Sequence, residues 1–215
     1  NSNINGVIVS ANSSFSAVYR NEIDLTNNTK DDLLVEVAVL AEKIREENFS
    51  ELLLTFTDIE DDSNYFAIDI LTGDKSGEGK SVSYVKAGAT NQLKSGWLDG
   101  SKNRLFSGGN YGTYTHFSFS GVNSGESNKT LKFYYDNEEK AIYVCFSGNS
   151  KIQIVDFDDP ECFSSPWKGL TNGKVKFTVQ TLGYNSGKAA VVVKTVNGFS
   201  MNGEYLIENE KPLIS

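Results

Sequence analysis

Apolar and polar residues alternate with a period of two along most of this 215-residue sequence. Side chains of a β-strand point alternately to the two faces of a sheet, so this pattern predicts strands with one buried face. About twelve such runs are present, and we expect each of them to form a strand: Val7–Ala11, Phe15–Arg20, Leu33–Leu40, Glu51–Ile59, Tyr65–Leu71, Ser81–Lys86, Thr115–Ser120, Thr130–Tyr135, Ala141–Phe146, Lys151–Phe157, Lys174–Thr181 and Ala189–Val196.

The segments between these runs carry turn-forming residues, as in TGDKSGEG, LTNG, YNSG and VNG. The two runs that flank Asp136–Glu139 (DNEE) predict a hairpin. No helices alternate with the strands and no internal repeat is visible, which disfavours a parallel sheet and a propeller. Only Ala41–Asn48 is rich in helix formers, and a short surface helix or a loop both fit it. We therefore predict an all-β fold, an antiparallel two-sheet sandwich, forming a single domain over residues 1–215.

The charge balance excludes some classes of partner. The chain has 20 Lys and Arg against 28 Asp and Glu, a net charge of −8, whereas nucleic-acid binding needs a basic face. The nearest basic stretch, Lys94–Arg104, is diluted by Gly, Ser and Asp. No run of about 18 apolar residues is present, so no membrane span is predicted. The start without Met and the Asn-, Ser-, Thr- and Gly-rich composition suggest a module excised from a larger extracellular or cell-surface protein, with neighbouring domains.

One acidic segment has the pattern of a catalytic site. TDIEDD has acids at alternating positions where a predicted strand ends, and a glycoside hydrolase needs two carboxylates about 5–10 Å apart. The alternative is a solvated turn between two strands. The single histidine, His116, lies in a strand-like run, which favours a structural role and excludes multi-histidine metal sites. We assign no catalytic residue and favour a non-enzyme; an enzyme would use Asp58, Glu60 and Asp62.

A second acidic segment runs from Ile154 to Trp167 (IVDFDDPECFSSPW). Calcium takes six to eight oxygen ligands from carboxylates and loop carbonyls, without needing an EF-hand motif. The alternative is a turn that ends a core strand, followed by a hydrophobic plug of Phe163, Pro166 and Trp167 that closes one end of the sandwich. If a structural calcium ion binds here, its ligands are Asp156, Asp158 and Asp159.

The two cysteines, Cys145 and Cys162, allow one disulfide at most. Such a bond would stabilise the fold by about 3 kcal/mol on the loop-entropy model. Two buried thiols are the alternative. Because neither belongs to a CxxC pair, no structural zinc site is predicted.

The stretch Lys94–His116 has the composition of a sugar-binding loop. Long irregular segments in compact domains are usually functional. Aromatic rings stack on sugars, and amide groups hydrogen-bond the hydroxyls. In the alternative, Trp97 and Leu98 plug the edge of the sandwich. The expected glycan contacts are Trp97, Asn110, Tyr111 and Tyr114, with Trp167 in addition.

The second half of the chain resembles a known family. A hairpin built on YYDNEEKAIYV is followed by a strand ending in DFDD, a Pro-Trp loop, the strand GKVKFTV and a final VVVKTVNG. Over Thr130–Gly198 this order is similar to the concanavalin A-like lectin and glucanase group, which includes laminin G-like modules. The resemblance implies a jelly-roll sandwich with a curved sheet and a ligand, commonly a carbohydrate, on its concave face or rim. The acidic E-x-D-x-E strand of the glucanases is missing.

These observations predict a non-catalytic, lectin-like carbohydrate-binding module of a secreted or cell-surface protein. Its partner would be a glycan or polysaccharide, and structural calcium would be its one candidate cofactor. A glycoside hydrolase or polysaccharide lyase of the same fold, and an adhesion or spacer module without a glycan ligand, are the alternatives.

Overall fold

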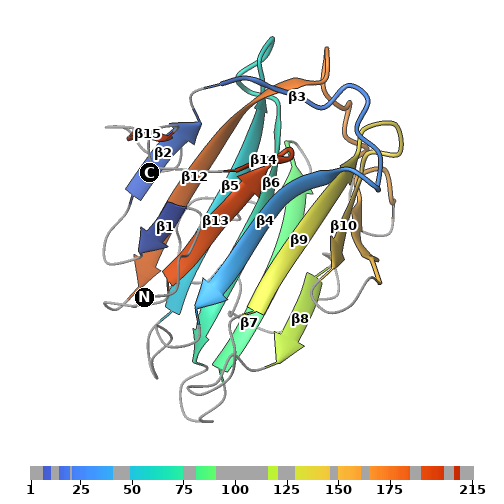
Figure 1. Cartoon of the computed structure of the whole chain (residues 1–215). Helices are drawn as coiled ribbons and strands as arrows, with labels where there is room; N and C mark the ends of the chain where they lie inside the picture. Colours follow the sequence, from blue (N-terminus) through green and yellow to red (C-terminus); the bar gives the residue numbers. More distant parts are fainter. Residues whose placement is uncertain are drawn as a thin grey trace.

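The computed structural model describes residues 7–10, 15–19, 21–40, 49–74, 81–90, 116–120, 129–145, 150–160, 165–184, 190–200 and 206–208. Within these residues the chain forms fifteen β-strands and no helix (Figure 1). The strands are β1 (Val7–Ser10), β2 (Phe15–Tyr19), β3 (Ile23–Asp24), β4 (Leu33–Leu40), β5 (Phe49–Asp58), β6 (Tyr65–Asp74), β7 (Ser81–Ala89), β8 (His116–Ser120), β9 (Lys129–Asp136), β10 (Ala141–Cys145), β11 (Ile152–Asp156), β12 (Lys174–Tyr184), β13 (Ala190–Val196), β14 (Phe199–Ser200) and β15 (Leu206–Glu208).

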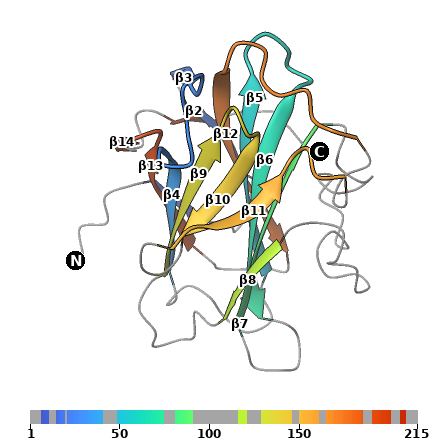
Figure 2. The ribbon, with the colours of Figure 1, turned by 90° about the vertical axis from the view of Figure 1, so that its right-hand side faces the viewer.

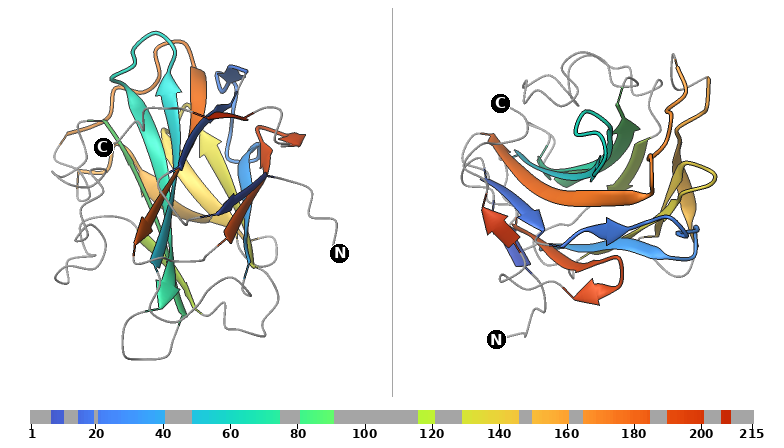
Figure 3. Two further views of the ribbon diagram at one scale, coloured as in Figure 1. Left: turned by 90° about the vertical axis from the view of Figure 1, so that its left-hand side faces the viewer. Right: turned by 90° about the horizontal axis from the view of Figure 1, so that it is seen from above.

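The described strands form two antiparallel sheets that lie face to face, as the view from above in Figure 3 shows. The seven-stranded sheet has the order β1-β13-β4-β9-β10-β11, with β14 beside β13. The eight-stranded sheet has the order β15-β2-β12-β5-β6-β7-β8, with β3 beside β12. The prediction of an all-β, two-sheet antiparallel sandwich is therefore confirmed. Strands from the two ends of the chain are interleaved: β13 lies between β1 and β4, and β12 between β2 and β5.

Each of the twelve predicted runs contains a strand, with ends that differ by a few residues. The three strands that the alternation did not predict are β3, β14 and β15, and each has only two or three residues. A run that short cannot show a period of two. The candidate helix Ala41–Asn48 lies outside the described residues.

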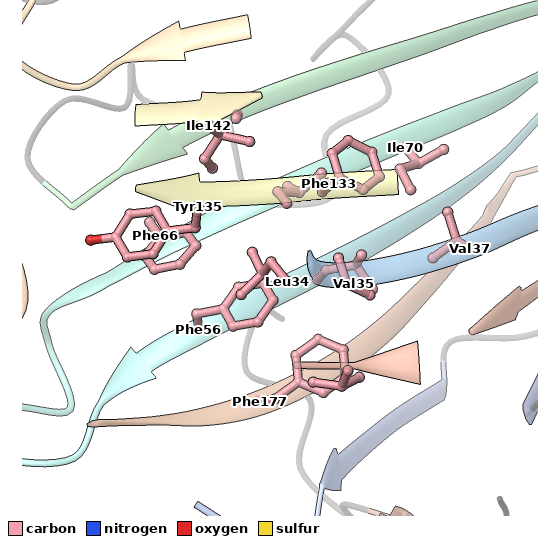
Figure 4. Close-up of a cluster of buried hydrophobic side chains, with 14 of the residues drawn as sticks. Leu34, Val35, Val37, Phe56, Phe66, Ile70, Phe133, Tyr135, Ile142 and Phe177 are labelled. Atoms are coloured by element: carbon pink, nitrogen blue, oxygen red, sulfur yellow. The ribbon is translucent and has the colours of Figure 1, made fainter. Parts of the chain in front are cut away.

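Aromatic rings join the two sheets at the centre of the core (Figure 4). Phe66 of β6 stacks on Phe56 of β5 at a centroid distance of 4.8 Å and on Tyr135 of β9 at 4.5 Å. Phe177 of β12 lies 5.0 Å from Phe56. Burying one such side chain stabilises a fold by about 1.5–3 kcal/mol, and stacked pairs add to this. The alternating Phe and Tyr residues of the sequence are thus the contact between the layers.

The predicted hairpin at Asp136–Glu139 joins β9 to β10, with Ala141 opposite Asp136. The Asp136 carboxylate accepts hydrogen bonds from the backbone N–H of Glu139 (2.9 Å) and of Lys30 (3.2 Å). Lys140 takes a positive φ of 51° as the chain enters β10. Asp136 therefore fixes its own turn and also holds the neighbouring loop.

Candidate functional site

The carboxylate of Asp58 is a structural acceptor at one end of the sandwich. Asp58 is 1% exposed. Its Oδ2 accepts hydrogen bonds from Asn64 Nδ2 (2.9 Å) and from the backbone N–H and hydroxyl of Thr171 (both 2.8 Å). Its Oδ1 accepts one from the Glu60 N–H (3.0 Å). Burial by itself raises the pKa of Asp58, but these four hydrogen bonds outweigh it and hold the pKa below its usual value.

Trp167 belongs to the same end of the molecule and is 2% exposed. Its ring packs edge-on against Phe157 and Phe66, with centroid distances of 5.0 and 5.7 Å. Its Nε1 donates to Asn64 Oδ1 (2.7 Å), and Asn64 in turn donates to the Gly169 carbonyl (2.9 Å). A buried ring offers no face to a sugar, so the expected glycan contact at Trp167 does not fit its position. The interpretation of Trp167 as a plug at the end of the core is confirmed.

The other acids of the TDIEDD segment also serve the loops or face solvent. Glu60 accepts a hydrogen bond from Asn172 Nδ2 (3.2 Å), and Asp62 is exposed. Asp61 pairs with Lys168 at 2.8 Å, and the hydrogen bond from Lys168 helps to lower the pKa of Asp61 to about 2. Because Asp58 is buried while Glu60 and Asp62 are exposed, the three predicted acids do not form one catalytic group.

The acids of the second segment hold the turn that follows β11. Asp156 Oδ1 accepts from the Asp158 N–H (2.9 Å), and the Asp156 carbonyl accepts from the Asp159 N–H (3.2 Å). Asp158 forms an ion pair with Lys140 at 2.6 Å, and Lys140 also donates to the Trp167 carbonyl (3.1 Å). Among the described residues, no three His, Cys, Asp or Glu side chains are grouped so that they could hold a metal ion. The Asp156–Asp159 turn is therefore arranged as a structural turn.

The predicted disulfide is only half within the described part of the chain. Cys145 ends β10 and is buried, whereas Cys162 lies outside the described residues. The pairing of the two cysteines stays a prediction.

The eight-stranded sheet has a buried outer face, and this is the most unusual feature of the fold. In a two-sheet sandwich one face of each sheet packs on the core and the other is commonly solvated. On the central strands here, the residues that alternate with the core positions are buried too. They are Leu53, Thr55 and Thr57 of β5, Ala67 and Asp69 of β6, and Thr178 of β12. We call this set the outer floor.

Asp69 is the carboxylate of the outer floor, and it is 1% exposed. In the sheet register it lies opposite Leu53 on one side and Lys86 on the other, and Lys86 lies opposite His116. Directly opposed residues in adjacent strands have Cβ atoms about 4.5–5.5 Å apart. Burying a charged group is costly unless it is paired or hydrogen-bonded, so ionisable side chains in such places are candidates for function.

The four expected glycan contacts of the long loop, Trp97, Asn110, Tyr111 and Tyr114, lie outside the described residues. The points where that segment leaves and rejoins the sheet are described. It leaves after Thr90, whose hydroxyl accepts from the Tyr65 N–H (2.7 Å) and donates to the Tyr65 carbonyl (3.0 Å). It rejoins at His116, where β8 pairs with β7 (Figure 2). Both ends are thus attached to the sheet edge next to Asp69.

The outer floor was missed by the sequence-based prediction, although one signal for it exists. Leu52, Leu53 and Leu54 are three consecutive apolar residues in β5. Alternate positions of a strand face opposite ways, so an unbroken apolar run indicates burial on both faces. Read in this way, the run would have marked β5 and its neighbour β6 as covered on the outside.

Comparisons with known proteins find no matching family model and no matching curated protein. Among solved structures, the chain is similar to an immunostimulatory antigen and pseudo beta-1,3-glucanase of Mycobacterium tuberculosis. The identity is 12% and the TM-score is 0.40, over 85% of this chain and 72% of the other. These values are too low to support any statement about function. Within the described residues, no helix is long and apolar enough to cross a membrane.

Proposed function

We propose that the chain is a non-catalytic carbohydrate-binding module of a secreted or cell-surface protein, and that the glycan binds over the outer floor of the eight-stranded sheet. The observation that supports this most directly is the burial of Asp69, Thr55 and Thr178 on the face that does not pack on the core. Polar side chains gathered in a covered part of a sheet are typical of ligand sites, where a few polar groups orient the ligand.

The chemistry of these groups suits a sugar. A carboxylate such as that of Asp69 accepts hydrogen bonds from hydroxyl groups, and a threonine hydroxyl both donates and accepts. Thr55 and Thr178 lie directly opposite each other in β5 and β12, so their hydroxyls belong to one small area. Trp97, Tyr111 and Tyr114 would supply the rings that stack on the apolar sugar faces.

Binding is favoured over hydrolysis by the number of carboxylates. Glycoside hydrolysis takes two carboxylates flanking the scissile bond. Among the buried outer-floor side chains that the structure describes, Asp69 is the one carboxylate. The acids at the end of the sandwich are used by the loops, as Asp58 illustrates. A single acid in a polar floor can orient a ligand without cleaving it.

The test is affinity electrophoresis of the purified chain in gels that contain one polysaccharide each, drawn from a broad panel. We expect retardation by at least one polymer, and its loss in Trp97→Ala and in Asp69→Asn. Lys132→Ala is the matched control, because Lys132 is exposed on β9 of the other sheet. Circular dichroism checks that each variant is folded. No retardation by any polymer would refute the proposal, and release of reducing ends that Asp69→Asn abolishes would replace it with an enzyme.

A further inference from the structure

The charges around the outer floor carry information about the ligand. We infer that the glycan is an acidic polysaccharide, one that bears carboxylate or sulfate groups. This inference rests on the proposed function and adds the chemical class of the ligand. It is carried by the cationic residues that flank Asp69 in the strand register and by the unequal distribution of charge along the chain.

Cations lie on both sides of the outer floor. On one side, Lys174 and Lys176 are exposed and alternate with the core residues of β12, so they belong to the outer face. On the other side, Lys86 of β7 and His116 of β8 lie opposite each other in register. At the positions of β7 and β8 that alternate with the core, the remaining residues are uncharged: Val82, Tyr84, Gly88, Ser118 and Ser120.

The acids near these cations are fewer and partly balanced. Lys174 lies opposite Asp24 of β3, and this lysine contributes to the lowered pKa of Asp24 after the larger effect of the Thr26 hydrogen bonds. Lys86 lies opposite Asp69. Lys176 lies opposite Thr57, an uncharged residue, so it has no acid across the strand from it. A ligand anion can therefore contact Lys176 without displacing an acid from the opposite strand.

The charge distribution along the sequence agrees with this arrangement. Residues 81–120, which begin at β7 and end at β8, contain Lys86, Lys94, Lys102 and Arg104 but only one acid, Asp99. Their net charge is 4 − 1 = +3, so the other residues carry −8 − 3 = −11. A positive region in an otherwise negative protein attracts anions to one place and repels them elsewhere. Nothing else described in the fold explains why the acids avoid this part of the chain.

The spacing favours a polymer over a single sugar. β12 and β7 are separated by β5 and β6, and adjacent strands lie about 4.8 Å apart, so Lys176 and Lys86 are on strands about 14 Å apart. Several sugar units are needed to span that distance. In such a complex the acidic groups would meet the flanking cations, and the hydroxyls between them would meet Asp69 and the threonines.

The experiment compares two polymers with the same backbone. Gels contain polygalacturonate, its carboxyl-reduced neutral form, or a sulfated polysaccharide. We expect retardation by an acidic polymer, little by the neutral form, and weakening as salt is raised. Lys176→Ala should weaken binding about tenfold, the effect of losing one charge-assisted hydrogen bond. Lys132→Ala, which removes the same charge from the other sheet, should change nothing.

Each outcome is informative. Retardation by the sulfated polymer alone assigns sulfate, and retardation by polygalacturonate alone assigns carboxylate. Equal retardation by polygalacturonate and its neutral form overturns the inference but leaves carbohydrate binding intact. An absence of retardation by every polymer overturns both. Equal binding to single-stranded DNA, or equal weakening by Lys176→Ala and Lys132→Ala, also overturns it, since either would indicate nonspecific ion exchange.

Discussion

Trp167 Nε1 donates a 2.7 Å hydrogen bond to Oδ1 of Asn64, a residue 103 positions earlier in the chain. Asn64 immediately precedes β6, and Trp167 precedes β12. Both side chains are buried, at 1% and 2% exposure. One bond thus ties together two loops at the upper end of the sandwich in Figure 1 and sets the indole in the core.

We expect Trp167→Phe to lower the free energy of unfolding by about 2–4 kcal/mol. The substitution removes part of a buried aromatic ring and leaves Asn64 Oδ1 without its donor, and each effect costs about 1–3 kcal/mol. Urea denaturation followed by fluorescence of the remaining tryptophan or by circular dichroism measures the change. Phe199→Ala is the control, because Phe199 is 64% exposed and should be nearly neutral. An equal loss in both variants would contradict the assigned role.

Replacing Asp58 with Asn should destabilise the fold by about 3 kcal/mol at neutral pH. The carboxylate accepts three hydrogen bonds at Oδ2 and one at Oδ1, and an amide must turn its NH₂ group toward one set of these donors. Urea denaturation at pH 7 measures the loss. Unchanged stability would show that the four bonds contribute nothing net.

Asp58 should also give the protein an acid-sensitive stability. Its folded-state pKa lies below the unfolded value of about 3.9, so the stabilisation is fully present above that pH and is lost as the pH falls through the lower folded-state pKa. Thermal unfolding of the wild type and of Asp58→Asn from pH 6 to pH 2 measures this. The difference between their melting temperatures should shrink as the pH drops below 4, and a constant difference would contradict the shift.

Two glycines with positive φ should differ in their tolerance of alanine. Gly173 has φ = 70°, and a Cβ added to it would lie 2.6–2.8 Å from atoms of Thr26, including its backbone. Gly198 has φ = 82°, and nothing lies within 4 Å of its Cβ position. Gly198→Ala should cost about 1–2 kcal/mol for the left-handed backbone alone, whereas Gly173→Ala adds a clash and should cost about 3 kcal/mol or more. Chemical denaturation ranks the two.

The phenol of Tyr143 should ionise late. Burial and the hydrogen bond that its hydroxyl donates to Glu139 (2.8 Å) raise the pKa of Tyr143 to about 12. In Glu139→Gln the nearby negative charge is gone, so the pKa should fall toward 10 without reaching it, because the burial remains. NMR titration of labelled tyrosine rings, with Tyr143→Phe to assign the signal, measures the change. An unshifted titration in Glu139→Gln would exclude the carboxylate as a cause.

The strands could be predicted because alternation follows directly from packing one face of a sheet on a core. Strand ends were predicted less well, since backbone pairing continues after the pattern stops. β12 was expected to end at Thr181 but runs to Tyr184, whose partner is Phe49 at the start of β5. The residues Leu182 and Gly183 have no alternating character, and only the neighbouring strand keeps them extended.

The roles of the acids could not be predicted, because they depend on partners far away in the sequence. Asp58 ends an alternating run and has the local pattern of a catalytic acid, yet its donors include Thr171, 113 positions later. Asp69 has the local pattern of a solvent-facing residue, yet it is buried. A sequence pattern indicates which way a side chain points, but tertiary structure determines what it meets there.

The interleaving of strands from the two ends of the chain has a consequence for synthesis on the ribosome. β2 and β4 have their described partners in β12, β13, β15 and β9, and both sheets pass through the late strands β12 and β13. The early strands therefore emerge long before the strands that complete their sheets. Such non-local pairing makes folding slow and leaves edges exposed meanwhile. Neither sheet can be completed until translation has passed residue 196.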